Sequence, residues 1–246
     1  MKKILIIGAT SAIASACARL WSKDHASFFL VARDNNKLEQ VRDDLLSRGA
    51  GQVKVHCLNF ADFSSYESML TKAVTELGKI DIALIAHGTL PDQTKCAESI
   101  ELTLEEISTN ALSVIAMLTP LANQMINQKE GSIAVISSVA GDRGRFSNYV
   151  YGAAKAAVST FCSGLRARLF HYQVHLLTVK PGFVATPMTQ NLHLPKILLA
   201  TPEKVAKDIL HGITKKKNSI YTPWFWALIM LIIKNIPDFV FKGIKI

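Results

Sequence analysis

The stretch KILIIGATSAIA, residues 3–14, decides the fold. Four consecutive apolar residues run into Gly8, as in a strand that is buried on both faces of a parallel sheet. Small residues follow as far as Ala14, where backbone N–H groups and a helix N-terminus can approach a pyrophosphate. The basic start followed by apolar residues imitates a secretory signal, but the apolar run is shorter than the ~7–15 residues of such a signal. We therefore interpret residues 3–7 as the first strand.

Apolar and helix-period segments alternate along the rest of the chain. Strands are expected at 3–7, 27–32, 53–57, 80–85, 132–137 and 174–180, and helices near 12–22, 35–48, 64–77, 103–128 and 150–170. This order predicts an α/β fold with a single doubly wound parallel-sheet Rossmann domain. The domain is expected over residues 1–222, with a substrate-lid region at 187–215, and residues 223–246 are expected to form a C-terminal apolar helical tail.

The composition excludes several classes of protein. With 49% hydrophobic and 19% charged residues among 246, the chain is not intrinsically disordered. Its four cysteines form no CxxC pair, so we expect reduced thiols in a cytoplasmic protein and no metal site. The net charge is +9, but the aromatic residues of the basic C-terminal region form an apolar block instead of alternating with lysines. A nucleic-acid partner is therefore not expected.

The tail combines apolar and basic residues. Trp224 and Trp226 lie at the start of an apolar block of 11 residues, 223–233, and Pro237 interrupts the segment that follows. The block is shorter than the ~20 residues of a spanning helix. Eight lysines against three acidic residues between 202 and 246 favour short helices on an anionic membrane surface. Burial in the core or contact with a second subunit is the alternative.

A second motif, Tyr151-Gly-Ala-Ala-Lys155, lies on helix-period sequence 13 residues after Ser138. Residues at i and i+4 project from one face of a helix. A cation beside a phenol lowers its pKa from about 10, which makes the phenol a usable proton donor near neutrality. Tyr151 is therefore a candidate general acid or base, and an ordinary exposed helix pair is the alternative.

These motifs together resemble the short-chain dehydrogenases/reductases over residues 1–223. The TGxxxGxG turn of that family corresponds to residues 7–14, where Ile7, Ala12 and Ala14 replace Thr, Gly and Gly. Its NNAG element corresponds to residues 85–88, of which only Gly88 is kept, and its PGxxxT element is present at 181–186. The resemblance implies a Rossmann fold, a nicotinamide cofactor and hydride transfer.

The resemblance also implies the roles of individual residues. The catalytic set corresponds to Asn110, Ser138, Tyr151 and Lys155. Ser138 would hydrogen-bond the substrate oxygen, Tyr151 would exchange the proton, and Lys155 would lower the pKa of Tyr151 and hold the ribose, while Asn110 would anchor a water relay. The cofactor would be held by Gly8, Thr10, Ser11, Ala12, Ile13, Arg33, Asn59, Phe60, Ala86, Gly88, Tyr151, Lys155, Pro181, Gly182, Val184 and Thr186.

The end of the second expected strand decides which cofactor is preferred. An acidic residue there accepts hydrogen bonds from the ribose of NAD, whereas a basic residue suits the 2′-phosphate of NADP. Ala32 takes the place of the acid and Arg33 follows it, so NADP(H) is favoured over NAD(H). Stacking of Arg33 on adenine with either cofactor is the alternative.

Two stretches, 140–152 and 236–246, are similar to a subgroup of the family, the bacterial reductase of decaprenylphosphoryl-2-keto-ribose. The similarity implies an oxidoreductase that interconverts a ketone and a secondary alcohol on a lipid-linked sugar or other apolar substrate, at the inner membrane surface. Arg143 and Arg145 lie in the expected substrate loop, where two guanidinium groups suit a phosphate, although they also fit as solvated loop charges.

Three functions stay open at this point. Besides the lipid-linked reductase, the sequence is compatible with a soluble 3-ketoacyl-type or small-carbonyl reductase and with a non-catalytic NADP-binding regulatory protein. A homodimer or homotetramer is expected because members of the family usually pair two long central helices.

Overall fold

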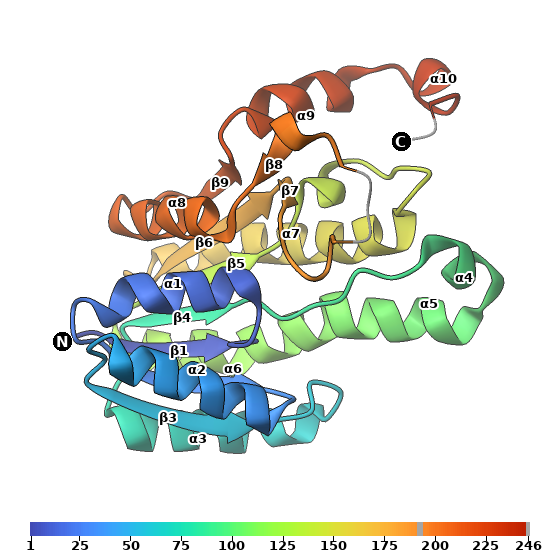
Figure 1. The fold of residues 1–246 in the computed structure, drawn as a ribbon. Helices are drawn as coiled ribbons and strands as arrows, with labels where there is room; N and C mark the ends of the chain where they lie inside the picture. The colour runs from blue at the N-terminus through green and yellow to red at the C-terminus, as the bar shows by residue number, and fades with distance from the viewer. Residues whose placement is uncertain (191–193, 245–246) are drawn as a thin grey trace.

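In a computed structural model of the chain, seven parallel strands form one sheet in the order β3-β2-β1-β4-β5-β6-β9 (Figure 1). The strands are β1 (Lys3–Ile7), β2 (Ser27–Ala32), β3 (Gln52–Cys57), β4 (Ile82–Ile85), β5 (Ser132–Ile136), β6 (His175–Pro181) and β9 (Ser219–Thr222). The structure describes residues 1–190 and 194–244. The strand order reverses between β1 and β4, as in a doubly wound Rossmann sheet, and the α/β fold expected from the sequence is confirmed.

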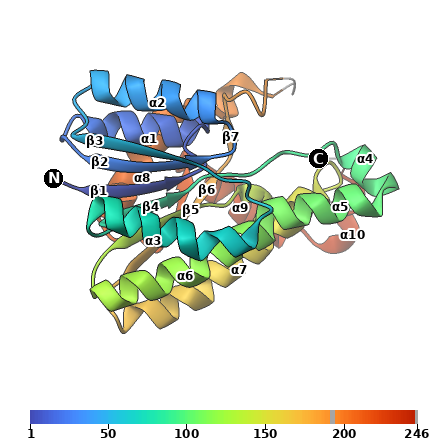
Figure 2. The ribbon, with the colours of Figure 1, turned by 90° about the horizontal axis from the view of Figure 1, so that it is seen from below.

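Helices cover both faces of the sheet (Figure 2). One layer consists of α1 (Ala12–Ser22), α2 (Asn35–Ser47) and α8 (Pro202–Thr214), and the other of α3 (Tyr66–Leu77), α6 (Ser113–Gln128) and α7 (Tyr149–Phe170). Successive side chains of a strand point to opposite faces. In β1, Ile4 and Ile6 therefore join the core under the first layer, whereas Leu5 and Ile7 join the core under the second. Both cores require the uninterrupted apolar run that opens the chain.

The single helix expected at 103–128 is two helices with a wider turn between them. After the short α4 (Gln93–Glu98), α5 (Ile100–Ile107) leads into a π-helical turn, Ser108–Leu112, and then into α6. The extra residue of a π-turn changes the face on which side chains lie, and such turns are frequent at functional sites. Here the π-turn contains Asn110, whose side chain is fully buried.

The C-terminal part contains elements that the sequence analysis did not predict. β9 pairs with β6 at the edge of the sheet, and α8 begins at Pro202 after the N-cap Thr201, whose hydroxyl accepts a hydrogen bond from the Lys204 amide. A second small sheet joins β7 (Phe183–Val184) to β8 (Leu199–Ala200). The lid region expected at 187–215 thus includes β8 and α8, while its residues 191–193 lie outside the described residues.

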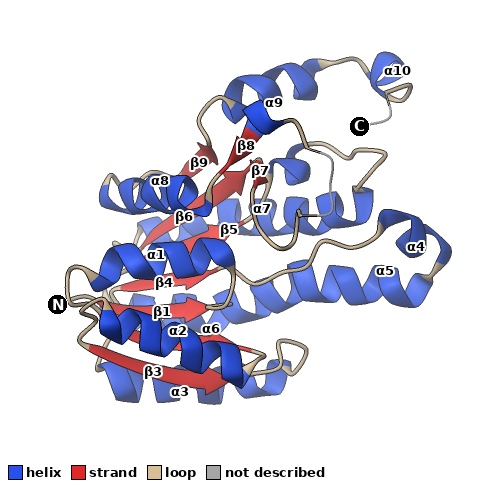
Figure 3. Cartoon of the chain, viewed as in Figure 1, coloured by secondary structure: helices blue, strands red, loops and turns tan. Residues whose placement is uncertain are grey.

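The tail forms α9 (Trp226–Asn235) and α10 (Asp238–Phe241), which lie beyond the end of the sheet (Figure 3). One face of the tail is buried through Trp226, Met230 and Phe241. Its other face exposes apolar side chains, namely Trp224, Leu228, Leu231, Ile232, Phe239 and Val240. Within the described part of the chain, no helix has both the length and the apolar character that a membrane span requires.

Candidate active site

A cavity of about 430 Å³ lies at the carboxyl ends of the central strands. Its lining includes residues that directly follow β1, β4, β5 and β6, the position where open α/β sheets bind ligands. Of the residues expected to function, those that line it are Gly8, Thr10, Ser11, Ala12, Ile13, Arg33, Phe60, Ala86, Gly88, Asn110, Ser138, Arg145, Tyr151, Lys155, Pro181, Gly182, Val184 and Thr186. Asn59 and Arg143 do not line it.

The turn between β1 and α1 brings backbone close to the cavity. Gly8 has φ +83°, and a Cβ atom there would lie 2.5 Å from the backbone nitrogen of His87, so only glycine fits. Ser11 caps α1 by accepting a hydrogen bond from the Ala14 amide at 3.2 Å. Thr10 to Ile13 line the cavity, where the first N–H groups of the helix have no partner within it. This turn can therefore hold an anionic group.

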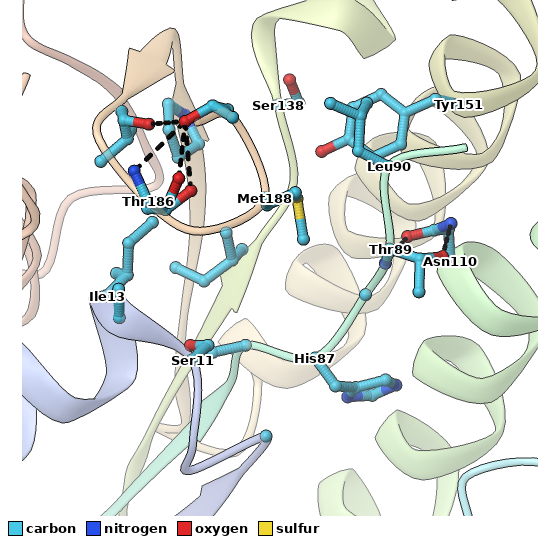
Figure 4. A pocket seen from close by; sticks show the side chains of 18 of the residues that line it. Ser11, Ile13, His87, Thr89, Leu90, Asn110, Ser138, Tyr151, Thr186 and Met188 are labelled. Carbon is cyan, nitrogen blue, oxygen red and sulfur yellow. Dashed lines mark hydrogen bonds between the residues drawn. The ribbon is translucent and has the colours of Figure 1, made fainter. Parts of the chain in front are cut away.

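Ser138 and Tyr151 lie at one end of the cavity, and Ser11 and Ile13 lie at the other (Figure 4). Ser138 follows β5, and its hydroxyl accepts a hydrogen bond from the Ala140 amide at 3.1 Å. Tyr151 belongs to the first turn of α7. Burial raises the pKa of Tyr151 to about 12, and the neighbouring Ser138 hydroxyl opposes this rise. The phenol is therefore protonated at neutral pH and can act as an acid.

Lys155 lies one helical turn after Tyr151 and is only 3% exposed. Its Nζ donates to the Ile136 carbonyl at 3.2 Å and lies 5.6 Å from the centre of the Tyr151 ring. Burial lowers the pKa of Lys155 to about 8. Desolvation thus disfavours the charged form of both groups, raising the pKa of Tyr151 and lowering that of Lys155, and the lowering of the Tyr151 pKa by Lys155 stays a prediction.

Asn110 is held by a polar network that the sequence analysis missed. Its Nδ2 donates to the Thr89 hydroxyl at 3.0 Å and to a Glu106 carboxylate oxygen at 2.9 Å, and its Oδ1 accepts from the Thr89 amide at 3.0 Å. At Gly88, a Cβ atom would come within 2.7 Å of Asn110 Oδ1 and 3.5 Å of Lys155 Nζ. Gly88 therefore allows Asn110 and Lys155 to lie close together.

Comparison with known proteins agrees with this geometry. The model of the short chain dehydrogenase family matches residues 2–196. The chain belongs to this family. It is 33% identical over 241 residues to an uncharacterized oxidoreductase of Mycobacterium tuberculosis, covering 97% of this chain and 95% of the relative. It is also 28% identical over 247 residues to an uncharacterized oxidoreductase of Streptomyces coelicolor, covering 100% of this chain and 96% of the relative.

A vertebrate relative is more distant. Dehydrogenase/reductase SDR family member 7B of Danio rerio is 27% identical over 236 residues, which cover 89% of this chain and 76% of the relative. The family and the names of its members identify the protein as an NAD(P)-dependent oxidoreductase. A dinucleotide fits the cavity at the turn between β1 and α1, because Thr10 to Ile13 line it with helix N–H groups that have no partner within the helix and suit a pyrophosphate.

The part of the cavity that is lined by the segment after β2 carries more basic than acidic side chains. Arg33 is exposed and lines the cavity together with Asp34 and Lys37. Asp34 caps α2 by accepting from the Lys37 amide, and this hydrogen bond lowers the pKa of the Asp34 carboxyl. Lys37 was missed by the sequence analysis, although it is visible one turn into the helix that follows Arg33. Asn59, expected at the adenine, instead accepts a hydrogen bond from the Ala61 amide at 3.1 Å.

His87 replaces a small residue of the family's NNAG element and lines the cavity (Figure 4). Its ring stacks on Phe60 at 4.3 Å between centroids, and its Nε2 is 2.8 Å from the Ser113 hydroxyl. Burial lowers the pKa of His87 to about 3, so the ring is neutral near pH 7. Sequence reasoning passed over His87 because its partners come from other elements.

The two arginines of the substrate loop have different positions. Arg143 binds the tail: its guanidinium donates to the carbonyls of Ile233 and Ile236, both at 2.6 Å, and to Asp238 at 2.7 Å. Arg145 lines the cavity and is 8% exposed. The tail also supports the cavity wall, because a Cβ atom at Gly182 would lie 1.9 Å from the Trp226 ring.

Proposed function

We propose that this protein is an NADP(H)-dependent oxidoreductase that interconverts a ketone and a secondary alcohol, with Tyr151 as the general acid or base. The observation that carries the proposal is the arrangement of Asn110, Ser138, Tyr151 and Lys155 along one cavity that begins at the Gly8 turn. When bound, the nicotinamide cofactor supplies or accepts the hydride. The protein supplies orientation and proton transfer.

The side chains divide this work among them. Ser138 donates a hydrogen bond to the substrate oxygen, and Tyr151, which is protonated at neutral pH, delivers a proton to that oxygen in the direction of reduction. Lys155, with a pKa of about 8, restores the proton to the phenol. The network of Asn110, Thr89 and Glu106 lies near the lysine, since Asn110 Oδ1 and Lys155 Nζ both border the space beside Gly88, and Asn110 would anchor the water through which the lysine is reprotonated.

The test is NADPH oxidation with a panel of ketones. Tyr151→Phe removes the proton donor without changing the shape of the ring, so turnover is expected to fall by about 10² or more while NADPH affinity stays within about twofold. Tyr149→Phe is the matched control, because Tyr149 lies on the same helix and is 46% exposed. Near-normal turnover by Tyr151→Phe would overturn the assignment. Cofactor binding without turnover of any ketone by the wild type would favour the non-catalytic alternative.

The preference for NADP(H) rests on the two cations Arg33 and Lys37 at the cavity. Arg33→Asp adds repulsion against the 2′-phosphate and removes an attraction, so the ratio of NADP to NAD affinity should fall about tenfold or more. Arg48→Asp, at the far end of α2, is the control. An unchanged ratio in Arg33→Asp would show that Arg33 does not recognise the 2′-phosphate.

We propose further that the substrate is lipid-linked or otherwise apolar, and that the protein works in the cytoplasm on the inner membrane surface. The exposed face of the tail supports this location. Leu231 and Ile232 are 61% and 67% exposed, and Lys234 follows them, which pairs apolar insertion with attraction to anionic lipid. Complete burial of one such side chain contributes roughly 1.5–3 kcal/mol, so partial insertion of several can hold the protein on a bilayer.

Co-sedimentation with anionic phospholipid vesicles tests the location. We expect the wild type to bind, less at high salt than at low salt because the charges are then screened. The pair Leu231→Asp and Ile232→Asp should abolish binding while leaving the buried face of α9 intact, and Phe170→Asp, at the end of α7, is the control. Failure of the wild type to bind, with a dimer that Leu231→Asp dissociates, would make the tail a subunit contact.

A further inference from the structure

Arg145 is a buried cation that forms no ion pair among the described residues. It is 8% exposed, and no carboxylate of the described residues lies within the 4.0 Å of an ion pair with it. The neighbouring Asp142 attracts Arg145 without forming an ion pair with it, since the two Asp142 oxygens accept from Lys180 at 2.5 Å and from the Tyr221 hydroxyl at 2.6 Å. Burying an unpaired charge is costly, which is why buried arginines are normally paired.

The hydrogen bonds of Arg145 do not compensate for its burial. Its Nη2 donates to the Met230 sulfur at 3.1 Å, a weak acceptor, and its Nε has no partner among the described residues. Two other partly buried arginines have strong oxygen acceptors for their guanidinium groups. Arg166 donates to the Leu176 carbonyl and the Thr178 hydroxyl, and Arg143 donates to two carbonyls and a carboxylate. Arg145 therefore keeps donor capacity that the described residues leave unused.

Arg145 lines the same cavity as Ser138 and Tyr151. Met230, which is fully buried and does not line the cavity, accepts from the guanidinium and so links Arg145 to the tail. A planar guanidinium with free N–H groups matches the paired oxygens of a phosphate or a carboxylate. The ligand that satisfies this position is an anion.

We propose that Arg145 binds an anionic group, a phosphate or a carboxylate, that the substrate carries near its carbonyl. The proposal rests on the proposed function for the carbonyl, but the anion site itself is defined by Arg145 alone. It narrows the substrate class from apolar ketones to ketones that combine an apolar part with an anionic group. Arg143, two residues earlier, takes no part in this site.

Binding is measured first, on protein saturated with NADP⁺ so that the phosphate sites of the cofactor are filled. Titration calorimetry measures the binding of three probes: phenylphosphonate, benzoate and the neutral benzyl alcohol. Arg145→Gln should lower the affinity for the tighter-binding anion at least about tenfold and change the affinity for benzyl alcohol less than about twofold. The stronger anion identifies phosphate or carboxylate as the group. Arg168→Gln, an exposed arginine of α7, is the control.

Turnover is measured next, with 5-hydroxy-2-pentanone, its phosphate monoester and 4-oxopentanoate. The wild type should favour one of the anionic ketones, and Arg145→Gln should remove that preference through KM instead of kcat. Arg145→Lys should restore part of it, because the charge remains. Thermal unfolding and NADPH binding report whether each variant folds. If a variant does not fold, the affinities of the wild type for the anionic and neutral probes show whether the cavity prefers an anion.

The outcomes separate the two proposals. Anion binding that depends on Arg145, without reduction of any ketone, would keep the anion site and overturn the proposed function. Reduction of ketones with no preference for charge, and equal binding of the anions by wild type and Arg145→Gln, would overturn the anion site and leave the reductase standing. An equal loss of affinity for all three probes in Arg145→Gln would show that Arg145 has only a structural role.

Discussion

The two walls of the cavity are held by different kinds of contact. The cofactor wall is backbone against backbone: the Gly8 amide donates to the Val31 carbonyl at 2.8 Å, and the space beside Gly8 is bounded by the backbone at His87. The substrate wall joins distant side chains: Arg143 reaches residues 90 to 95 positions later, and the Trp226 ring lies on Gly182. The cofactor wall follows from the order of the strands, whereas the substrate wall depends on particular pairs of residues, whose contact a single substitution can remove.

The largest loss of stability is expected from a substitution at Gly8, because the neighbouring backbone of Ala86 and His87 cannot move aside for a side chain. Gly8→Ala combines a positive φ with a 2.5 Å contact, so we expect a loss of more than about 3 kcal/mol in the free energy of unfolding, or loss of NADPH binding. Gly78→Ala separates the two causes, since Gly78 has φ +81° with nothing within 4 Å. It should lose only about 1–2 kcal/mol in denaturant unfolding. Equal losses would mean that the contact is unimportant.

Gly182 tests the other wall, where the obstacle is one side chain. Gly182→Ala would collide with the Trp226 ring, and we expect a loss of about 2–4 kcal/mol in unfolding free energy. In a Trp226→Ala background the same change should cost less than about 1 kcal/mol, because the two residues are in contact and their effects are not additive. An equal penalty in both backgrounds would contradict the idea that Trp226 defines the space at Gly182.

This contrast also explains what the sequence could predict. The strands β1, β2 and β6 and the helices α1 and α7 were predicted within one residue at each end. The spacing of apolar residues that marks a strand or a helix is contained in the residues of that element alone. The π-turn was not predicted, and the side chain of Asn110 within it is held by Thr89, 21 residues away in the chain. β9 was missed because a strand of four residues at the edge of the sheet carries little periodicity.

The candidate site divides in the same way. Ser138, Tyr151 and Lys155 were predicted from fixed spacing, and they meet at one cavity because one strand end and one helix carry them. Arg143 and Arg145 were assigned one role together. Their separation, one to the tail and one to the cavity, depends on where α9 packs, and neighbouring sequence does not contain that information.

The next largest effect is expected at Lys155, a buried lysine that lines the same cavity. Its pKa is about 8 in the folded protein against 10.5 ordinarily, so the buried charge destabilises the fold below pH 8. Between pH 8 and 10.5 the unfolded chain keeps the proton that the folded protein releases, so stability rises with pH. Lys155→Met should gain about 1–3 kcal/mol at pH 7 and flatten this rise, while turnover is lost.

Denaturant unfolding at several pH values provides the measurement. Lys129→Met is the control, because this lysine is exposed at the end of α6 and should leave the pH profile of the wild type unchanged. A Lys155→Met protein less stable than the wild type at pH 7 would contradict the predicted sign, and would mean that the bond from Nζ to the Ile136 carbonyl outweighs desolvation.

The smallest effect is expected at Arg143, which holds the tail onto the substrate loop. Its guanidinium side chain is 14% exposed, donates to the carbonyls of Ile233 and Ile236, and lies 3.9 Å from the centre of the Phe241 ring. Arg143→Ala should therefore weaken the docking of α9 and α10 by about 1–2 kcal/mol, while the Rossmann core, which does not depend on it, unfolds as before.

Limited trypsin digestion measures this local opening, because cleavage after Lys234 or Lys242 requires the tail to leave the surface. The rate of cleavage in Arg143→Ala should rise roughly 5- to 30-fold, the factor that 1–2 kcal/mol represents. Asp238→Asn is the matched variant: its carboxylate is fully exposed, so loss of that ion pair should change the rate little. Equal acceleration in both variants would assign the docking to the surface ion pair, and no acceleration in either would show that Trp226 and Met230 hold the tail without Arg143. In that case the substrate wall would resemble the cofactor wall in depending on packing alone.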